Sequence, residues 1–360
     1  MKIMVMKIAI LPGDGIGPEI LVQSLKVLKA ISLKFGHKFL IYKGLIGAES
    51  IKKKGLPITK ETINLCKSSD TILLGAVGDP LYDNDPTRNI RPEQGLLELR
   101  KKLCLYCNMR PIKTYNKLLK VAPIKQAVIK NVNFVIFREL TSGIYFGNKW
   151  RSKYEAYDIC TYNKHIIKKI AMKAFETARK RKKKITLVDK ANVLETSRLW
   201  RETVKEIAQE NQDIKVDYIF IDNASMQIVL QPRQFDILLT DNMFGDILSD
   251  EASVLVGSLG LLPSVSFGNH YSLYEPVHGS FTQAKGKNIA NPLGSIISVS
   301  LMLENFGFQK ESFLINRAVT ESINLGITTK DINTKNPCTT SAVGDFLFSS
   351  ILNKRKRRIR

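Results

Sequence analysis

The 360-residue sequence has few of the residues that build disulfide scaffolds, zinc sites and membrane spans. It holds only five cysteines and four histidines, and an odd cysteine count in so long a chain argues against a disulfide framework. Cys104 and Cys107 form a CxxC pair with no second pair or neighbouring histidine, so buried thiols are expected there instead of a zinc site. No run approaches the ~18 consecutive apolar residues of a membrane span, and no membrane partner is expected.

Acidic residues are also scarce, with 33 Asp and Glu against 55 Lys and Arg, which gives a net charge of +22. Six of the last seven positions, 354–360, are Lys or Arg. Such a tail fits a polyanion partner, but a solvated C-terminus is the commoner explanation. The lysine runs at 52–54 and 182–184 lack the interleaved aromatic residues of nucleic-acid-binding surfaces. Nucleic acid is therefore not the expected partner, and a basic polyanion-binding protein remains the alternative.

The N-terminal run MKIMVMKIAILPGDG lacks the small-residue cleavage site of a signal peptide and leads directly into a glycine-rich turn. It is interpreted as a first core strand, and a cytoplasmic protein is expected. The remaining composition, 44% hydrophobic and 24% charged, excludes a mostly disordered chain. The length suggests two domains.

Short apolar runs alternate with segments of helical period, which predicts an α/β fold. The segment 145–162 has weak periodicity and is interpreted as an extended arm. Strands are expected at 8–11, 39–42, 71–74, 133–138, 185–188, 217–221 and 235–239. Helices are expected at 18–34, 93–100, 165–181, 195–209, 246–256, 292–305, 311–324 and 342–352.

The glycine-rich turn PGDGIGPE (12–19) follows the first strand and opens a helix. A dinucleotide-binding fingerprint requires GxGxxG and an acidic residue about 20 positions further on. Here the spacing is GxGxG, and the second strand reads FLIYK at 39–43. A Rossmann fold is therefore not expected. A purely structural turn and a backbone that approaches a ligand remain equally open interpretations.

The segment TDNMFGDILSDE (240–251) carries the strongest chemical signal. Asp246 and Asp250 are four residues apart, so on a helix their Cβ atoms lie about 5–6 Å apart on one face. Two carboxylates so placed repel each other unless a cation lies between them, and oxygen ligands suit Mg²⁺. The alternative is that Asp246 simply caps the helix N-terminus. Asp222, at the expected end of a strand, is either a third ligand or a turn residue.

Several cationic residues and one tyrosine are further candidates. Arg100, Arg110 and Arg138 suit a polycarboxylate substrate, because the planar guanidinium binds carboxylates through two nitrogens, although surface ion pairs explain each one alone. Arg138 closes an apolar strand and needs an anionic partner if it is buried. Lys190 follows a strand and is a candidate base if neighbouring cations lower its pKa; otherwise it is a solvated loop cation. Tyr145 is a candidate proton donor or an aromatic anchor.

Together these segments resemble the β-decarboxylating dehydrogenases of 2-hydroxy acids, the isocitrate/isopropylmalate dehydrogenase family, and most of all its isopropylmalate branch. The resemblance covers nearly the whole chain apart from the basic tail, and several long motifs in the same order are highly specific. These motifs are IAILPGDGIGPE (8–19), RELTSGIYFG (138–147), VDKANVLE (188–195), FGDILSDE (244–251) and GKNIANP (286–292).

The resemblance implies a two-domain α/β fold that is not a Rossmann fold. Residues 1–105 and 257–360 would form the first domain. Residues 106–256 would form the second, with the metal site, the dimer interface and the arm near 145–162. The cleft between the domains would hold the small-molecule substrate and the cofactor. Family members are homodimers with shared active sites.

The resemblance also implies oxidation and decarboxylation with NAD and Mg²⁺ or Mn²⁺. Asp246, Asp250 and Asp222 of the partner subunit would hold the metal, and Asp222 would also contact the substrate. The three arginines would bind the substrate carboxylates. Lys190 of the partner subunit would accept the hydroxyl proton as hydride passes to the nicotinamide, and Tyr145 would return a proton after CO₂ leaves.

The expected substrate within the family follows from the segment EQGLLELR (93–100). Leu96 and Leu97, with Val193 of the partner subunit, would form an apolar pocket for an isopropyl group. Burying the third carboxylate of isocitrate there would cost several kcal/mol. The resemblance therefore favours 3-isopropylmalate and leucine biosynthesis. Isocitrate, homoisocitrate, tartrate and malate are the alternative substrates, and the leucines are otherwise only helix core.

The cofactor segment departs from the family, whose HGSAPDIAGK loop reads HGSFTQAKGK here (278–287). Gln283 stands where NAD-using members have an Asp that binds the ribose hydroxyls and repels the 2′-phosphate of NADP. NAD is therefore expected with weakened exclusion of NADP, which Lys285 and Lys287 would favour. Asp79 and Asp241 are further departures, to which the resemblance assigns no role. The implied cofactor contacts are His278, Gly279, Ser280, Gln283, Ile289 and Asn291.

Overall fold

A computed structural model describes residues 3–83 and 90–353, so the basic tail at 354–360 lies outside the described residues. The chain divides into two compact units. The first comprises the described residues up to Leu103, Ser258–Val265 and those from Tyr271 onward. The second comprises Cys104–Gly257 and the short segment Ser266–His270. Hydrogen bonds from Tyr106 N to the Phe267 carbonyl and from Asn108 Nδ2 to Ser266 Oγ join that segment to the second unit.

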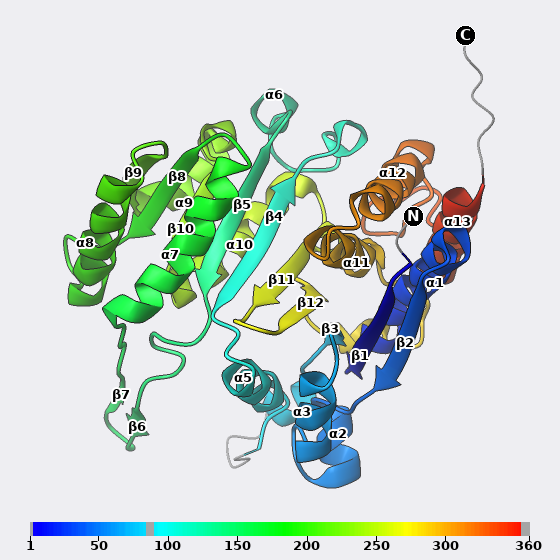
Figure 1. Ribbon diagram of the computed structural model, residues 1–360, viewed down its shortest axis with the longest axis horizontal. Helices are drawn as coiled ribbons and strands as arrows, with labels where there is room; N and C mark the ends of the chain where they lie inside the picture. The colour runs from blue at the N-terminus through cyan, green and yellow to red at the C-terminus, as the bar shows by residue number, and fades with distance from the viewer. Residues whose placement is uncertain (1–2, 84–89, 354–360) are drawn as a thin grey trace. The chain divides into compact units, whose positions relative to one another are not determined.

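The first unit contains a sheet in the order β2-β1-β3-β12-β11 (Figure 1). β1 pairs in parallel with β2 and β3, and β3 pairs in parallel with β12. The elements of this unit are β1 (Val5–Gly13), α1 (Gly17–Phe35), β2 (Lys38–Lys43), α2 (Ala48–Lys54), α3 (Lys60–Lys67), β3 (Thr71–Ala76), α4 (Pro80–Asp83), α5 (Glu93–Lys102), β11 (Pro263–Phe267, whose end lies in the second unit), β12 (Ser272–Pro276), α11 (Leu293–Asn305), α12 (Gln309–Leu325) and α13 (Thr340–Leu352), with 3-10 helices at Leu259–Leu261 and Thr282–Ala284.

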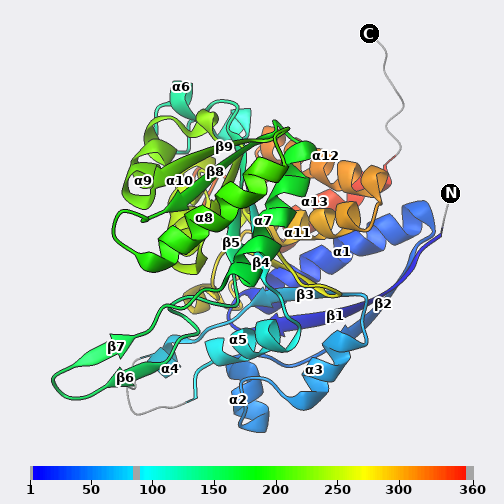
Figure 2. The same ribbon diagram turned by 60° about the vertical axis from the view of Figure 1, so that its left-hand side comes forward.

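Helices α1, α11, α12 and α13 pack together over this sheet (Figure 2). α1 forms where the sequence predicts it: Pro18 lies in its first turn, and Gly36, with φ 77°, ends it in the left-handed conformation. Ile20, Val27 and Ile31 recur at helical spacing and are fully buried. The first unit thus has its own apolar core.

The second unit contains a sheet in the order β4-β5-β10-β8-β9, in which β4 is antiparallel to β5 and the other pairs are parallel. Figure 1 shows α7 and α8 on one face of this sheet and α9 and α10 on the other. Its elements are β4 (Cys107–Lys113), α6 (Gln126–Ile129), β5 (Asn133–Glu139), β6 (Lys149–Arg151), β7 (Ala156–Asp158), α7 (Lys164–Arg179), β8 (Lys184–Asp189), α8 (Glu195–Glu210), β9 (Lys215–Phe220), α9 (Ile221–Leu230), β10 (Ile237–Thr240) and α10 (Asn242–Val256), with 3-10 helices at Asn116–Leu118 and Pro232–Gln234.

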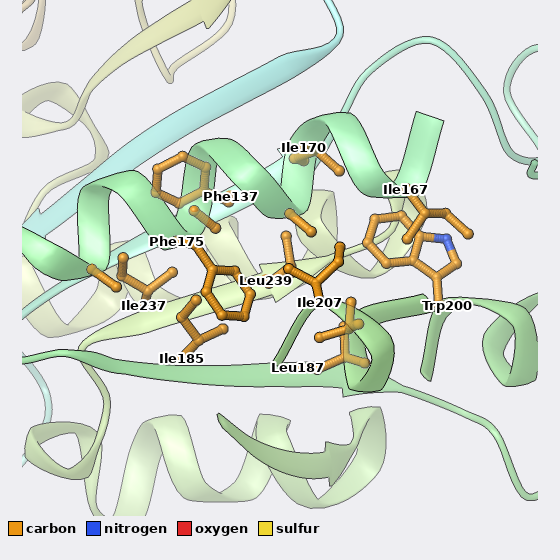
Figure 3. Close-up of a cluster of buried hydrophobic side chains, with 14 of the residues drawn as sticks. Phe137, Ile167, Ile170, Phe175, Ile185, Leu187, Trp200, Ile207, Ile237 and Leu239 are labelled. Carbon is orange, nitrogen blue, oxygen red and sulfur yellow. The ribbon is translucent and has the colours of Figure 1, made fainter. Parts of the chain in front are cut away.

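The core of the second unit lies between the sheet and helices α7 and α8 (Figure 3). Ile167, Ile170 and Phe175 of α7 follow the spacing of one helix face, and all three are fully buried. They pack with strand residues such as Leu187 and with Trp200 of α8. This core anchors the strands whose ends carry the candidate site residues.

The secondary structure differs from the predictions at several places. Strand β4 was not predicted, because its Arg110-Pro111 pair argues against a strand; it forms because β5 pairs with it in antiparallel register over its whole length. The strand expected at 217–221 ends at Phe220, and Ile221 begins α9. Strands β11 and β12 and helices α2, α3 and α9 were not predicted either.

The arm predicted at 145–162 contains a small exposed hairpin of β6 and β7, in which the Trp150 and Tyr157 rings stack 5.7 Å apart.

Within 3–83 and 90–353, no helix combines the length and apolarity needed to cross a lipid bilayer. The expectation of buried thiols holds for Cys107 but is wrong for Cys104, which is exposed and has a positive φ of 50° in the turn after α5. Burial raises the pKa of Cys107.

Candidate active site

The glycine-rich turn after β1 is packed tightly against neighbouring backbone. Gly13 and Gly15 have positive φ angles of 68° and 54°. A Cβ atom would lie 1.9 Å from the Ala76 carbonyl oxygen at Gly13 and 2.0 Å from the Ser280 carbonyl oxygen at Gly15. Between them, the buried Asp14 carboxylate accepts hydrogen bonds of 2.9–3.0 Å from the backbone N–H groups of Ala48, Glu49 and Gly78. These contacts favour the structural interpretation of the turn.

This turn also supports the segment predicted to bind the cofactor. Ile16 N donates to the Ser280 carbonyl at 2.8 Å. The Glu19 carboxylate accepts from the backbone N–H groups of Gly286 and Asn288, the latter at 3.2 Å. A small apolar cluster of Ile16, Ile20, Ala284 and Ala290 lies behind these bonds. The sequence motif therefore fixes the position of the loop that follows β12.

The predicted cofactor residues divide into buried and exposed ones. Asn291 is buried and donates to Asp331 Oδ2 at 2.8 Å, a partner that the sequence interpretation missed. The His278 Nε2 atom is buried without a hydrogen-bond partner among the described residues, and burial lowers the pKa of His278. Such an atom is ready to bond a ligand, so the segment fits a cofactor. Gly279, Gln283 and Ile289 are exposed, and Ser280 is half-buried.

Helix α5 carries three of the predicted substrate contacts. Arg100 Nη2 pairs with Glu275 Oε1 of β12 at 3.1 Å, and both side chains are largely buried. The sequence interpretation gave Arg100 no such acidic partner. Leu96 and Leu97 are half-buried, whereas Leu99 is fully buried. Leu99 is thus the core residue of this helix, and Leu96 and Leu97 keep surface available for a ligand.

Helix α10 begins earlier than predicted. Asp241 is its N-cap and accepts from Phe244 N at 2.8 Å, so the predicted start at 246 and the alternative that Asp246 caps the helix are both wrong. Burial raises the pKa of Asp241 to about 7. Asp79 has a similar local role, because its Oδ1 accepts from Leu81 N at 3.1 Å. The two unexplained acidic departures are therefore turn and cap residues.

Two buried arginines pair with Asp246 and Asp250 of α10. Arg138 Nη1 forms an ion pair with Asp246 Oδ1, which confirms that the buried Arg138 needs an anionic partner. Arg110 approaches both acids, with its Nη2 3.9 Å from Asp246 and its Nη1 3.6 Å from Asp250. Burial and the Asp246 charge raise the pKa of Asp250, and Arg110 opposes this. Asp246 and Asp250 thus lie on one helix face, as their spacing predicts, and the guanidinium groups of Arg110 and Arg138 pair with them.

Two asparagines hold these arginines, and the sequence interpretation named neither of them. Arg110 Nε donates to Asn108 Oδ1 at 2.7 Å. Arg138 donates to Asn242 Oδ1 through Nε at 3.0 Å and through Nη2 at 2.8 Å. Both asparagines are almost completely buried. The sequence signal for Asn108 is its place beside a predicted site residue in NMR (108–110), and Asn242 lies in the segment 240–251 that carries the predicted metal ligands.

Tyr145 joins the same cluster. Its hydroxyl donates to Asp246 Oδ2 at 3.0 Å, and the Arg138 guanidinium lies 5.7 Å from its ring centre. Burial, followed by the Asp246 charge, raises the pKa of Tyr145. The phenol therefore stays protonated at neutral pH, as a proton donor must.

Lys190, Asp222 and Val193 form a separate group in the second unit. Lys190 Nζ donates to Asp222 Oδ2 at 2.7 Å, and this bond lowers the pKa of Asp222. The charged partner of Lys190 is the Asp222 carboxylate, and the Arg201 guanidinium is a neighbouring cation, since Lys190 Nζ and Arg201 Cζ lie 5.8 and 5.1 Å from the centre of the Phe220 ring. Asp222 lies in the first turn of α9, so its predicted position at a strand end is wrong. Val193 is exposed.

No cluster of three or more His, Cys, Asp or Glu side chains able to hold a metal is found in residues 3–83 and 90–353. The chain instead offers the carboxylates of Asp246 and Asp250 on one face of α10, and Arg110 contacts both. Their oxygen donors fit a hard divalent cation that also receives ligands from substrate and water.

Comparisons with known proteins agree with these features. Residues 7–347 match the family described as isocitrate/isopropylmalate dehydrogenase. The 3-isopropylmalate dehydrogenase of Aquifex aeolicus is 50% identical over 332 residues, covering 91% of each chain, and that of Bacteroides fragilis is 48% identical over 326 residues, covering 91% of this chain and 92% of its own.

Solved structures give the same result. The isocitrate dehydrogenase of Methylococcus capsulatus has a TM-score of 0.87 at 34% identity, covering 97% of this chain and 100% of its own. A β-decarboxylating dehydrogenase of Thermococcus kodakarensis has a TM-score of 0.79 at 33% identity, covering 96% of each chain. The fold, the sequence and the acid–arginine cluster agree, and the chain belongs to the isocitrate/isopropylmalate dehydrogenase family.

Proposed function

We propose that this protein oxidatively decarboxylates 3-isopropylmalate to 4-methyl-2-oxopentanoate and CO₂, with hydride transfer to NAD, as a step of leucine biosynthesis in the cytoplasm. The cluster of Arg110, Arg138, Asp246 and Asp250 carries the proposal, because it combines guanidinium groups for carboxylates with oxygen ligands for a divalent cation. Relatives at 48–50% identity named 3-isopropylmalate dehydrogenase support the choice of substrate. NADH formation from 3-isopropylmalate with Mn²⁺, with isocitrate and malate as competitors, tests it.

The side chains of the cluster divide the work between binding and proton transfer. The guanidinium groups of Arg110 and Arg138, with Arg100, bind and orient the substrate carboxylates. Lys190 of the partner subunit, which lies outside this cluster in its own chain, takes the proton from the substrate hydroxyl. Tyr145 holds the proton that replaces the lost carboxylate, and its raised pKa keeps that proton in place at neutral pH.

Asp246 and Asp250 are the proposed ligands of Mg²⁺ or Mn²⁺, completed by Asp222 of the partner subunit. When bound, the metal supplies Lewis-acid stabilisation of developing negative charge on the substrate oxygen. The two aspartates share one helix face, where their like charges would destabilise the helix. Their pairing with Arg110 and Arg138 offsets this repulsion.

Homodimerisation is part of the same proposal. Helices α9 and α10 expose large apolar side chains, among them Met226, Leu230 and Ile247, each more than half exposed. Monomers rarely leave such a group of side chains in water. A Ser225–Glu251 hydrogen bond joins the two helices that carry them. A second copy of this chain would cover this surface and bring Lys190 and Asp222 of the partner subunit to the site.

Replacing Leu96 by serine is expected to lower kcat/KM for 3-isopropylmalate about tenfold, because a half-buried leucine contributes about 1–2 kcal/mol of apolar contact to a bound isopropyl group. Steady-state kinetics with 3-isopropylmalate and isocitrate measure the effect. Leu33→Ser, the same change at an exposed helix position of the same unit, is the control. Unchanged turnover of 3-isopropylmalate by Leu96→Ser would show that Leu96 only packs within the protein.

Replacing Gln283 by aspartate is expected to raise the preference for NAD over NADP at least about tenfold. The carboxylate accepts bonds from both ribose hydroxyls and repels a 2′-phosphate. The ratio of the two kcat/KM values measures this, with the exposed Gln309→Asp as a control of equal charge. The wild type is expected to use NADP measurably, and a negligible NADP rate in the wild type contradicts the role given to Gln283.

A further inference from the structure

Each of the two arginines beside α10 has a buried asparagine at the same edge of its guanidinium group. Asn108 Oδ1 accepts a hydrogen bond from Nε of Arg110, and Asn242 Oδ1 accepts hydrogen bonds from both Nε and Nη2 of Arg138. The exposed fractions of Asn108 and Asn242 are 0% and 1%. The two asparagines come from different elements, β4 and α10, so the repeated arrangement is not a consequence of one local turn.

The surroundings fix the orientation of both side-chain amides. Asn108 Nδ2 donates to Ser266 Oγ at 3.1 Å, and Asn242 Nδ2 donates to the Ser142 carbonyl at 3.1 Å. The backbone N–H of Asn242 also donates to Tyr162 Oη at 3.0 Å. A flipped amide would set an NH₂ group against a guanidinium N–H, donor against donor. The carboxamide oxygens must therefore face the arginines.

A guanidinium group has two edges that can bind an acceptor pair: one formed by Nε and one Nη, the other by both Nη atoms. The asparagines occupy the Nε edge of Arg110 and Arg138. The outer Nη atoms are thereby turned to the side where Asp246 and Asp250 lie. An aspartate at either asparagine position would hold the arginine equally well, but it would also neutralise the positive charge.

We propose that Asn108 and Asn242 are positioning residues for dicarboxylate recognition, each fixing one guanidinium group in place without adding a further negative charge beside it. This inference rests on the proposed function, because it takes Arg110 and Arg138 as contacts of the substrate. The inference requires above all that the side chain bonded to each arginine Nε is uncharged. Asparagine is the smallest side chain that offers a strong acceptor to Nε and a donor to a second group, here Ser266 Oγ or the Ser142 carbonyl.

The test replaces each asparagine by the isosteric aspartate. Asn108→Asp and Asn242→Asp are each expected to raise KM for 3-isopropylmalate roughly 10- to 100-fold, with a smaller change in kcat and with KM for NAD within about twofold of wild type. Asn163→Asp is the matched control: it adds the same charge in the same unit at the N-cap of α7, where aspartate caps as well as asparagine.

Calorimetric titration with 3-isopropylmalate and Mg²⁺, without cofactor, measures binding apart from turnover. Weakened binding in either folded aspartate variant supports the proposal, and thermal melts show which variants fold. Unchanged binding and KM in a folded variant overturn it, as does an equal rise in KM for NAD. A wild type that binds 3-isopropylmalate without oxidising it contradicts the proposed function alone, whereas a wild type that does not bind it contradicts both.

Discussion

Replacing Lys190 by methionine is expected to lower kcat for 3-isopropylmalate by about 10²- to 10⁴-fold while KM changes little. The reason is that a positioned base contributes that range to a reaction that begins with removal of a hydroxyl proton. Methionine keeps the length and apolar stem of lysine but has no amine. Steady-state kinetics with Mn²⁺ and saturating NAD measure the loss.

The matched control for this variant is Lys184→Met. Lys184 and Lys190 are 28% and 26% exposed, and each forms an ion pair with an aspartate, Asp217 at 3.1 Å and Asp222 at 2.7 Å. Because exposed ion pairs contribute little to stability, both variants are expected to fold and to melt near the wild-type temperature. A Lys190→Met enzyme with kcat like that of Lys184→Met contradicts the role of Lys190 as base.

Replacing Asp246 by asparagine is expected to have an effect of similar size, lowering kcat/KM by about 10³-fold or more, because it removes a charged ligand from the proposed metal site. Asparagine retains one oxygen for Arg138, and its NH₂ group can donate to the Tyr145 hydroxyl oxygen, so the fold is expected to persist. Loss of the Asp246 charge also removes one of the causes that raise the pKa of Tyr145. Electron paramagnetic resonance of Mn²⁺ measures metal binding independently of turnover.

Asp217→Asn, which removes an acid from strand β9, is the control for that variant. Wild-type affinity for Mn²⁺ in Asp246→Asn would contradict the assignment of Asp246 as a ligand. If Asp246→Asn loses activity but still binds Mn²⁺, the role of Asp246 is to position Arg138 and Tyr145.

A mixture of the two inactive variants tests whether the site is shared. If Lys190 of the partner subunit completes each site, a dimer of one Lys190→Met and one Asp246→Asn subunit contains one intact site. Random exchange then restores about a quarter of wild-type activity, since about half of the dimers are mixed and each has one working site of two. If both residues serve the same subunit, mixing restores nothing.

Much of the fold was predictable because it follows from local spacing. The buried face of α7 repeats at the period of a helix, and α1 has its proline and glycine at the expected ends. The acidic partner of Arg138 was predictable for a general reason: a charge inside an apolar strand cannot remain unpaired. Such predictions need only neighbours in sequence and one physical rule.

Other features depend on contacts that the sequence does not reveal. Strand β4 contains Pro111 and forms because β5 supplies its partner. Asp222 lies in the first turn of α9 instead of ending a strand, because β9 stops at Phe220, one residue earlier than its apolar run suggests. Asn242 and Arg138 are 104 residues apart, and Asn291 and Asp331 are 40 apart, so no local pattern joins them. Residues that hold other site residues were therefore the ones missed.

The most direct test of the central claim is the stoichiometry of the reaction with Mn²⁺. The account predicts one NADH and one CO₂ for each 3-isopropylmalate consumed, with no reaction after chelation of the metal. It also predicts that kcat/KM for isocitrate and for malate is at least about 100-fold lower than kcat/KM for 3-isopropylmalate. NADH without CO₂, turnover unaffected by a chelator, or isocitrate used as well as 3-isopropylmalate would contradict it.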